Sequence, residues 1–210
     1  MFYPNTKKEL KKAIKLWCHD QDAALEKYGD INSWDVSKIK NMSELFKNNI
    51  HFNSDISLWN VSNVKTMRAM FSDAILFNQN IGCWNVSNVK NMSDMFAGAS
   101  LFNSDISNWN VSNVTNMRGM FADTLAFNQD ISLWCTSNCK NMSEMFCSAI
   151  SFNQNISAWD VSSVSNMNFM FCNATSFTQD IGNWDISNVK KMDNIVTFTS
   201  LGTDIFTNSI

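Results

Sequence analysis

Apolar residues recur along the chain with a fixed period of 25 residues, and polar residues fill the intervening positions in nearly the same order each time. Residues 77–96 read FNQNIGCWNVSNVKNMSDMF, and residues 102–121 read FNSDISNWNVSNVTNMRGMF. Seven tryptophans mark the period without insertion or deletion: Trp34, Trp59, Trp84, Trp109, Trp134, Trp159 and Trp184. Such a period indicates structural units that stack, because no single unit can bury its own apolar face. We expect these tryptophans to lie in a continuous core.

Two apolar spacings follow one another within each repeat. Trp84 and Val86 alternate with polar residues, which is the spacing of a half-buried strand. Positions 89, 92, 95, 96 and 99 are apolar at helical spacing, with Asn91 as a candidate N-cap and Asp94 as the carboxylate of a capping box. The segment after Phe102 is rich in Asn, Ser and Asp, which is typical of a turn. Each repeat therefore predicts a short strand, a short helix and a polar turn.

The fold class predicted from these elements is an α/β repeat solenoid. It would be a leucine-rich-repeat-like stack of seven 25-residue repeats with a helical N-terminal cap. Residues 1–30 lack the motif, and Thr6 with Glu9 forms a capping box ahead of an apolar helical face, so we assign these residues to the cap. We assign residues 31–198 to the seven-repeat array and residues 199–210 to a degenerate C-terminal end, all within one structural domain.

Two polar patterns predict contacts between neighbouring repeats. One asparagine follows a phenylalanine in five successive repeats, at Asn53, Asn78, Asn103, Asn128 and Asn153. We interpret these residues as a structural ladder in which each amide bonds the backbone of a turn or the next asparagine. The second pattern places Arg68 between Glu44 and Asp94, and Arg118 between Asp94 and Glu144. It predicts inter-repeat ion pairs, which at exposed positions contribute about 0 to 1 kcal/mol each and therefore fix registry more than stability.

Composition narrows the class of protein without identifying a function. The chain has 210 residues, a net charge of -3 and a pI near 5.3, and no apolar run approaches the length of a membrane helix. The N-terminus, MFYPNTKKEL, has no apolar signal segment. This favours an intracellular or virion-associated protein over a secreted one, and a cell-surface location would require trimming from a longer chain. The six cysteines do not form a disulfide framework, although Cys147 and Cys172 share a position in adjacent repeats, and whether they are bonded stays open.

Little in the sequence indicates catalysis. The two histidines, His19 and His51, lie in unlike contexts without matching Ser, Asp or Cys partners, and no glycine-rich phosphate loop is present. We therefore expect no enzyme activity, no catalytic residue, no metal site and no cofactor. Asp105 and Asp130 occupy the same turn position in adjacent repeats and could share a calcium ion. The presence of Asn at this position in other repeats favours an Asx turn instead.

Three motifs carry a resemblance to a known family. The segments FNQDIS, W-[DN]-V-S-N-V and N-M-x-x-M-F resemble the BspA-like surface-protein repeat of about 25 residues over residues 5–198. The leader T-K-x-E-L-x-x-A-I-x-x-W is similar to that of members from protists and large DNA viruses. The resemblance implies a relative of leucine-rich repeats that serves surface display, adhesion or partner binding, and it does not imply an enzyme.

The leading functional hypothesis is a rigid scaffold that presents one variable residue per repeat to a protein or glycan. The candidate positions form what we call the presenting column: Leu58, Cys83, Asn108, Leu133, Ala158 and Asn183. Asn60, Asn85 and Asn110 lie one position beyond the neighbouring tryptophans. An alternative is a structural subunit that assembles into a homo-oligomer or virion through the weakly capped C-terminal end.

A third hypothesis is a peripheral protein that binds anionic surfaces. Its candidate site is the basic column, which consists of Lys40, Lys65, Lys90, Lys140 and Lys190. Five lysines of the predicted N-terminal helix, all between residues 7 and 15, add to this charge. The net negative charge of the chain and the lack of interleaved exposed aromatic residues argue against nucleic acid as the partner.

Overall fold

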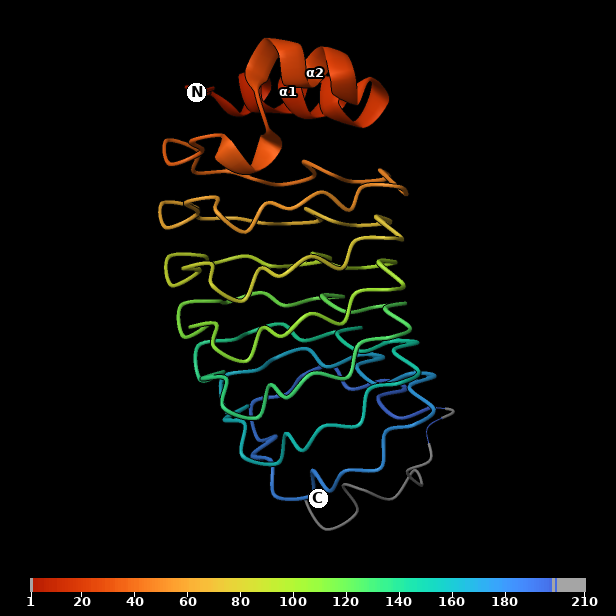
Figure 1. Cartoon of the computed structure of the whole chain (residues 1–210). Coiled ribbons are helices and arrows are strands. Elements are labelled where there is room, and N and C mark those ends of the chain that lie inside the picture. Colours follow the sequence, from red (N-terminus) through yellow and green to blue (C-terminus); the bar gives the residue numbers. More distant parts are fainter. Residues whose placement is uncertain (1, 198, 200–210) are drawn as a thin grey trace.

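The structure is a computed structural model that describes residues 2–197 and Thr199. Two helices, α1 (Lys7–His19) and α2 (Gln21–Tyr28), lie at the N-terminal end of a stack of coils, followed by a 3-10 turn, η1 (Ile31–Ser33). Figure 1 shows the successive coils lying one beside the next along a single direction away from these helices. Domain bounds at 30 and 198 stay a prediction, and residues 200–210 of the predicted C-terminal end lie outside the described residues.

The helices cover the first coil because one face of α1 is apolar. The Thr6 hydroxyl accepts the Glu9 backbone N–H at 3.2 Å, which is the predicted N-cap contact. The Glu9 carboxylate accepts the backbone N–H of Asn5 at 2.7 Å, where a capping box would have that of Thr6. Leu10, Ala13, Ile14 and Trp17 are buried on the side that faces the stack. The Trp17 indole also donates to the Ser54 hydroxyl at 2.8 Å. A stack needs such a cover, because its first coil would otherwise expose the core.

The predicted α/β repeat solenoid, with its leucine-rich-repeat-like strand and helix per repeat, is wrong. Apart from η1, none of the described coils contains a helix or a strand of more than one residue. Adjacent coils are joined by a single parallel bridge each, from Asn41–Thr66 to Asn166–Lys191. The repeats are nevertheless real, because each coil repeats the same hydrogen bonds 25 residues later.

The residues expected to form a helix are a succession of tight turns. Met95 donates its N–H to Met92 and Ala99 donates to Phe96, each three residues back, at 3.2 and 2.9 Å. The N–H groups of Met92 and Phe96 donate instead to the next coil, to Asn116 and Met120, both at 3.0 Å. Because alternate donors leave the coil, the i to i−4 pattern of an α-helix cannot form. Turn corners three residues apart bury apolar side chains at the spacing that a helix would also use.

Two columns of residues adopt the left-handed backbone conformation in every described coil. The first is Glu44, Ala69, Asp94, Gly119, Glu144, Phe169 and Asn194, and the second is Asn48, Asp73, Gly98, Asp123, Ser148 and Asn173. Asp94, with φ of 56°, is therefore not the third residue of a helix, and the capping box predicted there does not exist. Asn, Asp and Gly, which tolerate this conformation best, fill most of the second column.

Aromatic side chains form the core of the stack. Phenylalanines of successive coils lie parallel, with ring centroids 5.7 Å apart for Phe71–Phe96 and 5.8 Å for Phe96–Phe121. All seven repeat tryptophans are buried, at 1% to 4% exposure. Six of them also donate the indole N–H to an isoleucine carbonyl of the preceding coil, as Trp109 does to Ile81 at 3.0 Å. Each tryptophan thus contributes both apolar burial and an inter-coil hydrogen bond.

Asparagine side chains join the coils at the surface of the core. The Asn78 side-chain oxygen accepts the Asn103 backbone N–H at 2.9 Å, and the other members of the predicted ladder make the same contact. A second asparagine column, absent from our sequence interpretation, donates side-chain N–H groups to serine carbonyls of the preceding coil. Its members are Asn63, Asn88, Asn113, Asn138 and Asn188.

Candidate binding surfaces

The presenting column lies at tight turns, which hold its side chains toward solvent. Trp59 donates its N–H to Ile56 at 3.1 Å, so Leu58 stands at the corner of a turn. Leu58 is 75% exposed and Leu133 is 92% exposed, although both are large apolar residues. Cys83, Asn108, Ala158 and Asn183 are exposed as well. This column therefore offers one accessible side chain per coil on a fixed backbone.

The neighbouring asparagines are held by their own turns. The side-chain oxygens of Asn60, Asn85 and Asn110 each accept the backbone N–H of the serine two residues later, at 3.1 to 3.2 Å. These contacts are Asx turns, in which the side chain replaces a backbone acceptor. The oxygens are thus occupied within the turn, and the amide N–H groups are the part that could meet a partner.

The lysines of the basic column are exposed in all five coils that carry them. Their backbones are tied together, because Lys65 donates its N–H to Lys40 at 2.8 Å and Lys90 donates to Lys65 at 2.9 Å. Lys7 of α1 extends this charge, since its ammonium lies 3.2 Å from the Asn41 side-chain oxygen beside Lys40. Burial, with help from Lys11, lowers the pKa of Lys7. The arrangement is a row of positive charges along one side of the stack.

A row of ion pairs runs beside the basic column. Arg68 pairs with Glu44, and Arg118 lies between Asp94 at 3.2 Å and Glu144 at 2.7 Å. The expected fourth contact, from Arg68 to Asp94, is not among the ion pairs formed by the described residues. Burial raises the pKa of Asp94 in spite of Arg118, and Glu144 adds to the rise. The pairs therefore bridge coils without providing strong net stabilisation.

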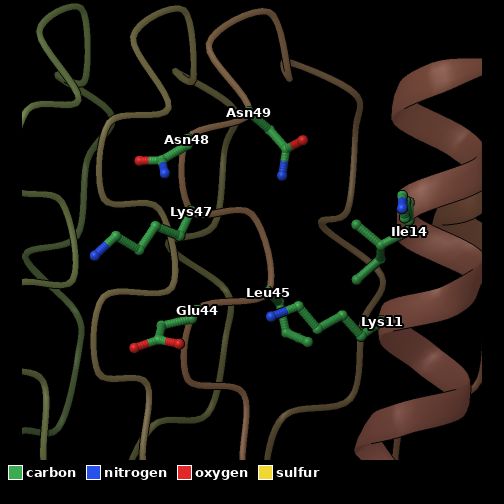
Figure 2. Close-up of a pocket in the computed structure, with 8 residues that line it drawn as sticks. Lys11, Ile14, Glu44, Leu45, Lys47, Asn48 and Asn49 are labelled. Carbon is green, nitrogen blue, oxygen red and sulfur yellow. The ribbon is translucent and has the colours of Figure 1, made fainter.

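A shallow cavity of about 270 Å³ lies where α1 meets the first coil. Figure 2 shows Lys11 and Ile14 of α1 facing Leu45, with Glu44 and Lys47 on the same stretch of the coil. Glu44 is already paired with Arg68, and no second carboxylate lines the cavity. The cavity is the junction between the cap and the stack.

The fold brings together the two histidines that the sequence left apart. His19, at the end of α1, and His51, in the first coil, line the same cavity of about 440 Å³ with Cys18. Burial raises the pKa of the Cys18 thiol to about 11, so this thiol is protonated at neutral pH and is a poor nucleophile. Across the described part of the chain, no group of three His, Cys, Asp or Glu side chains is arranged to hold a metal ion.

The acidic turn column uses its carboxylates within the turns. Asp105 and Asp130 each accept the backbone N–H of the serine two residues later, at 2.9 Å. These hydrogen bonds lower the pKa of both carboxyls. Cys147 and Cys172 face each other across adjacent coils as free thiols.

Sequence reasoning missed one surface. Six large apolar residues on consecutive coils are 39% to 50% exposed: Ile50, Ile75, Leu76, Leu101, Leu125 and Ile150. We call this set the apolar ridge. Its signal was present as an apolar residue one or two positions before the repeated phenylalanine. It was missed because our interpretation assigned no element to the positions between the predicted helix and the phenylalanine.

The comparisons with known proteins agree with a repeat architecture. The family described as "Mycoplasma protein of unknown function, DUF285" matches residues 18–130 and again residues 102–206. This chain belongs to the DUF285 family. The two overlapping matches together span most of the chain, as expected where one motif recurs. No curated protein and no solved structure matches the chain. No helix among residues 2–197 is long and apolar enough to cross a membrane.

Proposed function

We propose that this DUF285 protein is a non-enzymatic repeat scaffold that binds a protein or glycan partner through the presenting column. The observation that carries this proposal is the exposure of Leu58 and Leu133, at 75% and 92%. The apolar columns around them are buried in coil after coil, whereas this column varies in residue type and points to solvent. The resemblance to BspA-like repeats supports the same role, in adhesion or surface display.

The physical basis is a preformed surface. Each presenting residue stands on a turn closed by a backbone hydrogen bond, as between Trp59 and Ile56. Binding to such a surface costs little conformational entropy, because the backbone is already ordered. Burying one fully exposed leucine stabilises a complex by about 1.5 to 3 kcal/mol. Two such residues three coils apart would therefore act as apolar anchors, with asparagine amides between them as polar contacts.

The second candidate function is binding to an anionic surface through the basic column. The exposure of all five lysines, and the position of Lys7 next to Asn41, favour this alternative. Assembly through the C-terminal end remains a third possibility, and most of that end lies outside the described residues.

A comparative affinity capture would test the three hypotheses together. The wild-type chain, a Leu58→Asp/Leu133→Asp variant and a Lys65→Glu/Lys140→Glu variant would be immobilised and exposed to source extract and to a glycan array. The two matched pairs alter different columns at exposed positions, so all three chains should fold.

Each outcome favours one hypothesis. A partner lost only with the leucine variant supports the presenting column. A partner lost only with the lysine variant supports the anionic-surface alternative and contradicts the proposal. Recovery of the chain itself and nothing else would support assembly.

A further inference from the structure

The apolar ridge is the largest group of exposed apolar residues on consecutive coils. Leu101, at its centre, is 50% exposed, and its neighbours on the coils before and after, Leu76 and Leu125, are 39% and 41% exposed. The coils are in contact here, since Leu101 donates its N–H to Ile75 at 3.2 Å. Patches of roughly 300 to 600 Å² are the largest that monomeric proteins expose, and they commonly mark interaction sites. The ridge is separate from the presenting column on which the proposed function rests.

The surroundings of the ridge are acidic. The eight-residue segments that contain it in five consecutive coils are 48–55, 73–80, 98–105, 123–130 and 148–155. They contain five aspartates and neither lysine nor arginine. Asp73 and Asp123 are exposed on one side of the ridge, and Asp105 and Asp130 are exposed on the other. A partner that covers the ridge would therefore be favoured by positive charge on both flanks.

The backbone at the ridge is already hydrogen-bonded. Leu76 donates to Ile50 at 3.1 Å, Leu101 donates to Ile75, and Ala126 donates to Ser100 at 3.0 Å. An added strand gains affinity from main-chain hydrogen bonds, and these donors are not available to it. A helix needs no such bonds from its partner, because its own backbone is satisfied internally. The ridge consequently suits a helix that contacts it through side chains alone.

The spacing of the ridge also matches a helix. Phenylalanine rings that directly follow the ridge are 5.9 to 6.0 Å apart between successive coils, from Phe52 to Phe152. The pitch of an α-helix is about 5.4 Å, so each helical turn would meet one coil. The four intervals between Ile50 and Ile150 correspond to a helix of about 16 residues.

We propose that the apolar ridge docks a cationic amphipathic helix of about 16 residues, whose apolar stripe lies along the ridge and whose Lys or Arg side chains face the flanking aspartates. An anionic lipid surface fits less well, because the aspartates would repel it. A second copy of this chain fits less well too, because its ridge carries the same acidic flanks.

The test uses the full chain and a synthetic helical peptide of about 18 residues, with leucine once per turn and lysine on both flanks. Fluorescence anisotropy would measure its binding to wild type, to Leu101→Ser/Leu125→Ser, and to the matched control Leu58→Ser/Leu133→Ser. The control removes two leucines that are more exposed and lie off the ridge. Thermal unfolding of all three chains would show that the variants fold. A peptide with glutamate in place of lysine would test the charge requirement.

We expect the lysine peptide to bind wild type, with affinity reduced about tenfold or more in the ridge variant and unchanged within about twofold in the control. The glutamate peptide should bind at least about tenfold more weakly. Equal binding by both peptides, equal loss in both variants, or no binding at about 1 mM would overturn the proposal. Ridge-dependent dimers in sedimentation, or ridge-dependent binding to phosphatidylserine vesicles, would also overturn it in favour of another occupant. Because Leu58 and Leu133 belong to the presenting column, loss of peptide binding in the control variant alone would assign the peptide to that column and would likewise overturn the proposal for the ridge.

Discussion

Replacing Trp109 with alanine tests whether the tryptophan column holds the stack together. The Trp109 side chain is 3% exposed, its indole N–H donates to the Ile81 carbonyl at 3.0 Å, and its ring lies 6.2 Å from that of Phe96. Truncating a buried tryptophan costs about 3 to 5 kcal/mol, and the unpaired Ile81 carbonyl adds about 1 kcal/mol. We therefore expect Trp109→Ala to lower the free energy of unfolding by about 5 kcal/mol.

A second substitution separates packing from hydrogen bonding. Trp109→Phe keeps most of the apolar contact and loses only the indole donor and some volume, so we expect a cost of about 2 kcal/mol. Leu133→Ala is the matched control. Since Leu133 is 92% exposed, its truncation should change stability by less than about 0.5 kcal/mol.

Urea unfolding followed by circular dichroism would measure all three variants. For a chain of this length, the alanine variant should also melt about 10 to 20 °C below wild type. If Trp109→Ala and Leu133→Ala cost the same, the tryptophan column would not be the core, and the stacking described above would be wrong. Equal costs for Trp109→Phe and Trp109→Ala would instead assign the stability to the hydrogen bond.

Three further predictions concern individual side chains. Burial raises the pKa of Asp94, so ionisation of this carboxyl opposes folding as pH rises through that pKa. Asp94→Asn should therefore change the free energy of unfolding at pH 7 by less than about 0.5 kcal/mol. A larger loss in urea unfolding would mean that the ion pair with Arg118 outweighs the effect of burial. Hydrogen bonds from Ser107 lower the pKa of Asp105 in the folded chain. The stabilisation by this carboxylate is therefore present above the pKa of the unfolded state and is lost as pH falls through the pKa of the folded state. Asp105→Asn should make the free energy of unfolding less sensitive to pH below about 4, and an unchanged pH profile would contradict this. Cys139 is buried, and burial raises the pKa of its thiol to about 11. Iodoacetamide should therefore modify the exposed Cys83 and Cys135 and spare Cys139 in the folded chain, as mass spectrometry would show.

The amino-acid sequence alone determined the repeat period and the residues that form the core. A 25-residue repeat places Trp, Phe and Met at the same positions each time, and stacking follows because these residues must leave water. The N-cap contact between Thr6 and Glu9 could also be predicted, because capping depends on residues close in sequence. The placement of Arg118 between Asp94 and Glu144 could be inferred as well, since stacking brings equivalent positions together.

Only the tertiary structure decided the local conformation and the exposed apolar surface. Met92 and Phe96 donate to the next coil, and such bonds between residues 24 positions apart cannot be recognised from apolar spacing within one repeat. For the same reason, a helix was expected where turns and left-handed residues such as Asp94 occur. Whether Leu101 points inward or outward depends on the turn that precedes Phe102. The ridge could therefore be recognised only from the three-dimensional arrangement of the coils.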